Sequence, residues 1–97
     1  MAKEIETRKK AIQELTSQGW LIWYPAKVRY KQNDIFGIID LLALKKNKMR
    51  YIQLTTLPNV ARQRKKILSF FKKNKVKLPV EIWVWLKRER QFKIEMV

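Results

Sequence analysis

The stretch that decides the fold is Gly37–Thr56, which reads GIIDLLALKKNKMRYIQLTT. Gly37 introduces the short apolar run Ile38–Leu44, and Met49–Thr56 is a second run of similar character, so each predicts a β-strand. The polar segment Lys45–Lys48 lies between them and predicts a turn. The stretch therefore predicts an antiparallel β-hairpin.

Asp40 stands in the middle of the most apolar part of this hairpin. A carboxylate in apolar surroundings is costly unless it is hydrogen-bonded or paired with a charge. Two interpretations follow from the residue alone. Asp40 is either a strand-end aspartate satisfied by a backbone N–H or a nearby lysine, or a metal ligand that faces a groove.

The neighbouring strand bears on this choice. If Lys46 and Asn47 form the centre of the turn, Asp40 lies opposite Gln53, and Thr55 lies on the same face because strand side chains alternate. Directly opposed residues have Cβ atoms about 5 Å apart. The pattern predicts a polar cluster of Asp40, Gln53 and Thr55 that could share a metal ion or a water molecule.

The remaining elements extend the hairpin to an α/β fold. A helix is expected over residues 3–18 with its stop at Gly19, followed by a strand over Trp20–Tyr30 in which Pro25 favours an edge or a bulge. A second helix is expected from Val60 to about Asn74, with its apolar side formed by Val60, Ile67, Leu68, Phe70 and Phe71. Two further strands are expected over Val80–Leu86 and Gln91–Met96. The order α-β-β-β-α-β-β predicts a single domain, residues 1–97, with a central mixed sheet flanked by helices.

The charge of the chain predicts its partner. Twenty-three Lys and Arg residues face eight Asp and Glu residues, which gives a formal net charge of +15. Such an excess is typical of proteins that bind nucleic acid, with an anionic membrane as the second possibility. No apolar run is long enough to cross a membrane, and no signal sequence is apparent, so a cytoplasmic protein is expected.

The residues that are missing limit the chemistry. The chain has no histidine and no cysteine, which excludes histidine general bases, Ser-His and Cys-His hydrolases and His- or Cys-ligated zinc sites. Hydrolysis by this chain would therefore depend on carboxylates and a hard metal ion such as Mg²⁺.

The stretch Asp34–Leu44 followed by Tyr51–Thr56 resembles small phage and archaeal members of the PD-(D/E)XK nuclease superfamily, which have the restriction-endonuclease-like fold. Archaeal Holliday junction resolvases share the same general plan of elements. The resemblance implies a homodimeric endonuclease that uses Mg²⁺ or Mn²⁺ to cut DNA phosphodiester bonds, with a preference for junctions or branched DNA.

The resemblance also implies roles for particular residues. Asp40 matches the metal-binding Asp of the family, and Gln53 stands at the position of the metal-binding acid. Thr55 stands where the family has a lysine that activates water, and a hydroxyl group cannot supply that positive charge. Glu6 or Glu4 of the first helix would complete the site. Asp34 would either add a second carboxylate to the metal site or cap the turn before Phe36.

The basic residues expected to contact phosphates are Lys27, Arg29, Lys31, Arg62, Arg64, Lys65 and Lys66. Arg62, Lys65 and Lys66 are also candidates to replace the missing lysine. The four tryptophans favour core and edge packing over base stacking, while an exposed pair of Trp83 and Trp85 would indicate a dimer surface.

Three functions stay open. The first is the metal-dependent endonuclease, and the second is a DNA-binding module on the same fold that has lost cleavage. The third is a structural or partner-binding protein in which the charge is incidental.

Overall fold

The structure is a computed structural model that describes residues 2–25 and 35–97. The helices of this part of the chain are α1 (Ala2–Ser17), the short 3-10 helix η1 (Leu57–Asn59) and α2 (Val60–Asn74). The strands are β1 (Leu21–Trp23), β2 (Leu41–Lys45), β3 (Lys48–Thr55), β4 (Val80–Leu86) and β5 (Gln91–Met96).

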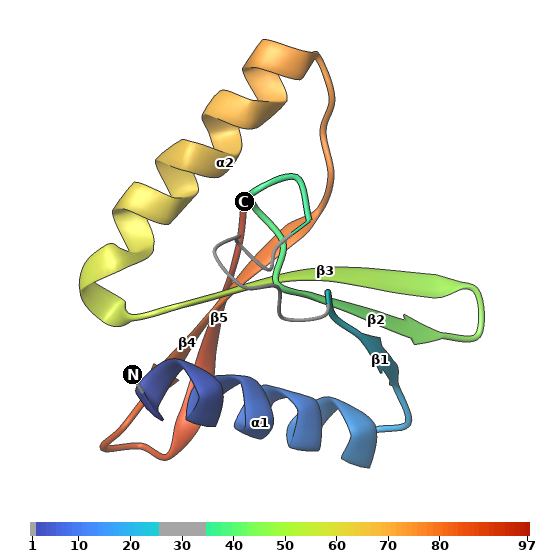
Figure 1. Cartoon of the computed structure of the whole chain (residues 1–97), viewed down its shortest axis with the longest axis vertical. Helices are drawn as coiled ribbons and strands as arrows, with labels where there is room; N and C mark the ends of the chain where they lie inside the picture. Colours follow the sequence, from blue (N-terminus) through green and yellow to red (C-terminus); the bar gives the residue numbers. More distant parts are fainter. Residues whose placement is uncertain (1, 26–34) are drawn as a thin grey trace.

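The strands form one sheet in the order β1-β2-β3-β4-β5 (Figure 1). The pair β3 and β4 is parallel, because α2 carries the chain from the end of β3 back to the start of β4, and the other three pairs are antiparallel. The expected α/β class, with a mixed sheet and flanking helices, is confirmed.

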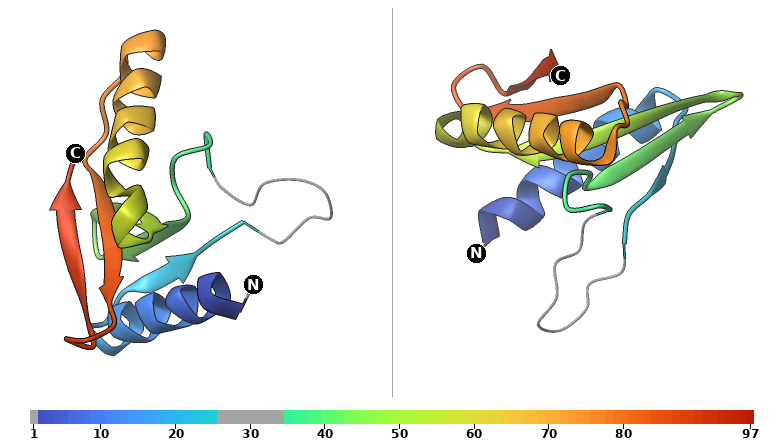
Figure 2. Two further views of the ribbon diagram at one scale, coloured as in Figure 1. Left: turned by 90° about the vertical axis from the view of Figure 1, so that its left-hand side faces the viewer. Right: turned by 90° about the horizontal axis from the view of Figure 1, so that it is seen from above.

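The helices pack on opposite faces of the sheet (Figure 2). Alternation along β4 shows this division, since Ile82 packs in a cluster with Ile67 and Phe71 of α2, and Trp83 packs in a cluster with Leu15 of α1. We call these surfaces the α2 face and the α1 face. They are useful below because each candidate site residue on a strand is assigned to one of them.

Both helices end in a left-handed residue. Gly19 has φ 91°, its N–H donates to Thr16, and the N–H of Trp20 donates to Leu15. This is the hydrogen-bond pattern of a Schellman motif, and it confirms the stop expected at Gly19. At the end of α2 the left-handed position is taken by Lys75, with φ 53°.

The hairpin has the expected turn and register. Lys46 and Asn47 separate β2 from β3, and the ladder runs from Lys45 opposite Lys48 to Leu41 opposite Ile52. The strand that was expected from Ile38, however, begins only at Leu41. Ile35–Ile38 instead form a tight turn, closed by a hydrogen bond of 3.1 Å from the N–H of Ile38 to the carbonyl of Ile35.

Two other expectations need correction. The first strand ends at Trp23, so Tyr24 and Pro25 are not part of it. The rest of its expected range, residues 26–30, lies outside the described residues. Leu68 was expected on the apolar side of α2, but it is exposed, because the inward stripe of the helix is set by Val60, Ile67 and Phe71.

Candidate metal site and nucleic-acid interface

Asp40 lies immediately before β2, at the point where the ladder with β3 ends. Its N–H donates to the carbonyl of Ile52, and its Oδ2 accepts the N–H of Leu54, each over 2.8 Å. The carboxylate thus takes the place of a main-chain acceptor. The ladder has the expected register but ends at Leu41 opposite Ile52, so Asp40 and Gln53 lie one step beyond its last pair. The two residues are neighbours nonetheless, because Asp40 binds the residue that follows Gln53.

Gln53 is buried on the α2 face of β3, two residues along from Tyr51. Its Nε2 donates to the carbonyl of Leu54 over 3.2 Å. Its Oε1 is buried and accepts no hydrogen bond from the described part of the chain. A buried amide oxygen without a partner is rare in folded proteins and indicates an ion, a water molecule or strain. Thr55 is half-buried and follows on the same face by alternation.

The donor chemistry of this cluster fits a hard cation. A carboxylate, an amide oxygen and a hydroxyl group are the oxygen ligands that Mg²⁺ accepts, usually together with several water molecules. The donor set is weakly charged, however, since within residues 2–25 and 35–97 no group of three or more acidic residues lies together. Among the described residues, Asp40, Gln53 and water would therefore bind an ion held here.

Gln63 of α2 is a residue that the sequence argument missed. It is half-buried, and its Oε1 is a second buried oxygen for which the described residues offer no donor. Gln63 lies three residues after Val60 and four before Ile67, so it belongs to the stripe of α2 that faces the sheet. A polar residue at an inward position of an amphipathic helix was the signal available in the sequence.

The other residues expected at the metal site are placed differently. Glu6 is exposed on α1, which packs on the opposite face of the sheet from Gln53. Asp34 lies outside the described residues, as do Lys27, Arg29 and Lys31.

The basic residues of α2 divide into two kinds. Lys65 and Lys66 are exposed, and Arg62 is exposed with a hydrogen bond to Asn59. Arg64 is half-buried, donates to the carbonyl of Met96 and forms an ion pair with Glu95 of β5. The Arg64 side chain thus joins α2 to the edge of the sheet. Its guanidinium, which was expected to contact a phosphate, is paired in the structure with the carboxylate of Glu95. The hydrogen bond from Arg64, aided by Lys93, lowers the pKa of Glu95.

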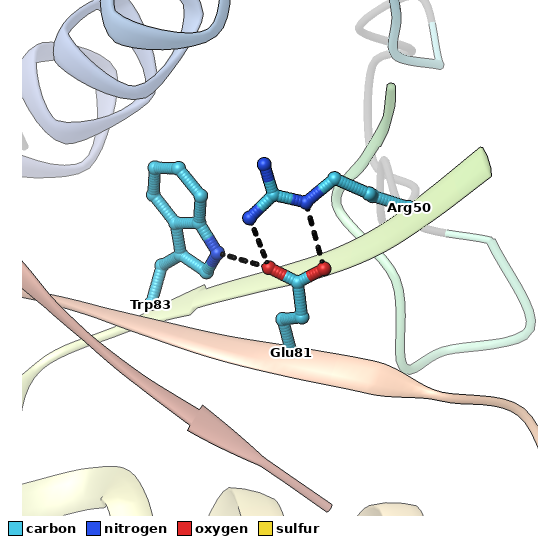
Figure 3. A network of polar contacts seen from close by, with 3 residues as sticks. All are labelled: Arg50, Glu81 and Trp83. Atoms are coloured by element: carbon cyan, nitrogen blue, oxygen red, sulfur yellow. Dashed lines mark hydrogen bonds and ion pairs between the residues drawn. The ribbon is translucent and has the colours of Figure 1, made fainter. Parts of the chain in front are cut away.

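A polar network on the α1 face was also not anticipated (Figure 3). Arg50 of β3 binds both carboxylate oxygens of Glu81 on β4, over 2.8 and 2.5 Å, and the indole N–H of Trp83 donates to Glu81 over 3.0 Å. The hydrogen bond with Glu81 raises the pKa of the Arg50 guanidinium. Arg50 also lies over the rings of Trp20 and Trp83. The network links the two parallel strands β3 and β4 through their side chains.

The tryptophans differ in exposure. Trp83 is buried, and Trp20 and Trp85 are half-buried beneath the cationic groups of Arg50 and Lys10. Core and edge packing therefore accounts for three of the four. Trp23 is the exception, because 56% of it is exposed at the end of β1.

Comparison with family models, with curated proteins and with solved structures finds no match to this chain. Among the described residues, no helix is long and apolar enough to cross a membrane.

Proposed function

We propose that the chain is a metal-dependent endonuclease that hydrolyses DNA phosphodiester bonds on a restriction-endonuclease-like fold. The observation that carries the proposal is the buried Oε1 of Gln53, which lacks a partner among the described residues. Gln53 directly precedes Leu54, whose N–H donates to the Asp40 carboxylate. Support comes from the net charge of +15 and from the exposed cations of α2.

In this proposal Asp40 and Gln53 hold a Mg²⁺ or Mn²⁺ ion at the end of the β2–β3 ladder. The ion supplies charge for the phosphate and lowers the pKa of a bound water molecule. Thr55 lies on the same strand face and binds water through its hydroxyl group. Lys65 and Lys66 bind the DNA backbone and supply the positive charge that Thr55 lacks.

The second candidate is a DNA-binding module on this fold that does not cut. It is favoured by the neutral side chains of Gln53 and Thr55, which remove charge from both positions where the resembling nucleases have it. In this case Asp40 has a structural role, and its carboxylate holds the hairpin end through the N–H of Leu54.

Asp40→Asn is the variant that separates these candidates. Asparagine retains an acceptor for the N–H of Leu54 but removes the negative charge. The assay incubates labelled four-way junction, duplex and single-stranded DNA with Mg²⁺ or Mn²⁺. For the endonuclease, the wild type cuts and Asp40→Asn loses at least about a hundredfold in rate while binding DNA with unchanged affinity.

Gln53→Glu and Thr55→Lys are the companion variants. For the second candidate the wild type cuts none of the substrates, and the double variant, which restores an acid and a lysine, gains metal-dependent cleavage. Glu89→Gln is the matched control, since it also removes a negative charge but lies exposed in the turn between β4 and β5, away from the hairpin. Equal cutting by wild type and Asp40→Asn would contradict a metal-binding role for Asp40.

A further inference from the structure

An apolar surface lies on the α2 face of the sheet, next to the proposed site. Cross-strand pairing places Leu21, Leu44 and Met49 in one row and Trp23, Leu42 and Tyr51 in the next. Leu21 is 71% exposed, Trp23 56%, Leu44 38% and Met49 43%. We call these six residues the platform. Leu42 and Tyr51 are half-buried against the cluster that includes α2, whereas Figure 1 shows that β1 and the turn end of β2 and β3 extend beyond the part of the sheet that α2 covers.

The platform adjoins the proposed metal site along the same two strands. Asp40 precedes Leu42 by two residues, and Gln53 follows Tyr51 by two residues. Two residues of an extended strand span about 7 Å. The row of Trp23, Leu42 and Tyr51 therefore lies about 7 Å from the Asp40 and Gln53 end of the hairpin. The row of Leu21, Leu44 and Met49 lies about 7 Å farther along the strands.

Charge indicates the occupant. The chain carries +15, and the turn at the end of the platform has exposed lysines at positions 46 and 48, while Lys45 donates to the carbonyl of Gln18. A partner with flat apolar surfaces and a dense negative charge is complementary to this combination, and unpaired nucleotides have both. A second copy of the chain carries the same +15, so repulsion opposes its docking here.

Shape disfavours a membrane. α2 packs on the same face of the sheet as the platform, and packed layers lie about 10 Å apart. The platform is thus the lower part of a step. A flat bilayer would meet α2 before it reached Leu44 or Met49, whereas a single strand of nucleic acid is narrow enough to lie along the step.

We infer that the platform binds unpaired nucleotides next to the cleavage site, with Trp23 as the residue on which a base stacks. The inference rests on the proposed function in taking DNA as the polyanion, and it extends that function to substrates with unpaired strands. Trp23 is suited to this role because it is the one described tryptophan with most of its surface exposed.

The test measures binding in EDTA, so that it does not depend on cleavage. The probes are fluorescently labelled oligo-dT and a duplex of the same length, read by anisotropy. Trp23→Ala is expected to weaken oligo-dT binding by about five- to a hundredfold and to leave duplex binding within a factor of about two. Trp23→Phe is expected to recover most of the loss, because phenylalanine retains a ring for stacking.

Met96→Ala is the control, because Met96 is also exposed but lies on β5 at the opposite edge of the sheet. It is expected to bind both probes as the wild type does. Equal weakening of both probes by Trp23→Ala, or no weakening, would overturn the inference. So would a change from dimer to monomer in sedimentation, or binding to anionic vesicles that depends on Trp23 without binding to oligo-dT. A chain that binds oligo-dT through Trp23 but cuts no DNA contradicts only the endonuclease.

Discussion

Single residues determine how the two helices end. Gly19 and Lys75 both follow a helix with positive φ, yet only glycine adopts this conformation without a steric cost from Cβ. A Cβ at Gly19 would meet only the side chain of Lys45, at 3.5 Å, which is an ordinary contact. The effect of a side chain at either position is therefore a backbone effect, and the two positions can be compared directly.

We expect Lys75→Gly to stabilise the fold by about 1 kcal/mol and Gly19→Ala to destabilise it by about the same amount. The reason is the left-handed conformation, which glycine favours relative to any residue with a Cβ. Urea unfolding measures both changes as shifts of the midpoint at constant m-value. Lys75→Ala serves as the control, since it removes the charge but retains a Cβ in the left-handed conformation. If Lys75→Ala raised the free energy of unfolding as much as Lys75→Gly, the explanation by backbone conformation would be contradicted.

At the scale of elements, the parallel pair β3 and β4 is joined by an ion pair as well as by its ladder. The carboxylate of Glu81 is buried and receives two bonds from Arg50 and one from Trp83. Such a pair is not by itself a source of stability, because desolvation opposes the attraction. Loss of one partner is nevertheless costly, because the other charge is then left without compensation.

We expect Glu81→Leu to destabilise the fold by about 3 kcal/mol. The double variant Arg50→Met/Glu81→Leu is expected to be more stable than Glu81→Leu alone, because no unpaired guanidinium remains between the tryptophan rings. Chemical denaturation of the wild type and the two variants measures their free energies of unfolding and so gives their order of stability. A double variant less stable than Glu81→Leu would indicate that Arg50 acts through packing on Trp20 and Trp83 more than through its charge.

At the scale of the whole molecule, the positive charge is unevenly available to a ligand. Arg64 is held by Glu95 and by the carbonyl of Met96, while Lys65 and Lys66, the next residues on α2, are exposed. Neighbouring cations on one helix therefore serve different purposes. One fixes the helix to β5, and the others face solvent where a phosphate can reach them.

We expect Lys66→Ala to weaken DNA binding and to reduce the slope of log affinity against log salt concentration by about one. Arg64→Ala is the matched variant, and it is expected to change that slope less while lowering the free energy of unfolding, because the link to β5 is lost. Salt titrations of DNA binding, together with urea unfolding, measure both. If the two variants changed the slope of log affinity against log salt concentration equally, the distinction between a structural Arg64 and a DNA-binding Lys66 would be contradicted.

The sequence by itself determined the α/β class, the hairpin turn with its register and the stop of the first helix, but not the limits of the first two strands. The apolar run Ile38–Leu44, the polar turn and Gly19 are local signals, and such signals predict these features without tertiary information. The sequence also brought attention to Asp40, Gln53 and Thr55, because polar residues inside an apolar hairpin stand out without any tertiary information.

Only the tertiary structure decided which charged residues pair with each other and which tryptophans are exposed. Arg64 and Glu95, and likewise Arg50 and Glu81, are thirty-one residues apart in sequence, and their pairing depends on how α2 and β4 return to the sheet. The exposure of Trp23 and the burial of Trp83 depend in the same way on which part of the sheet each helix covers. Periodicity specifies which side of an element is apolar, but the packing of distant elements decides whether that side is covered.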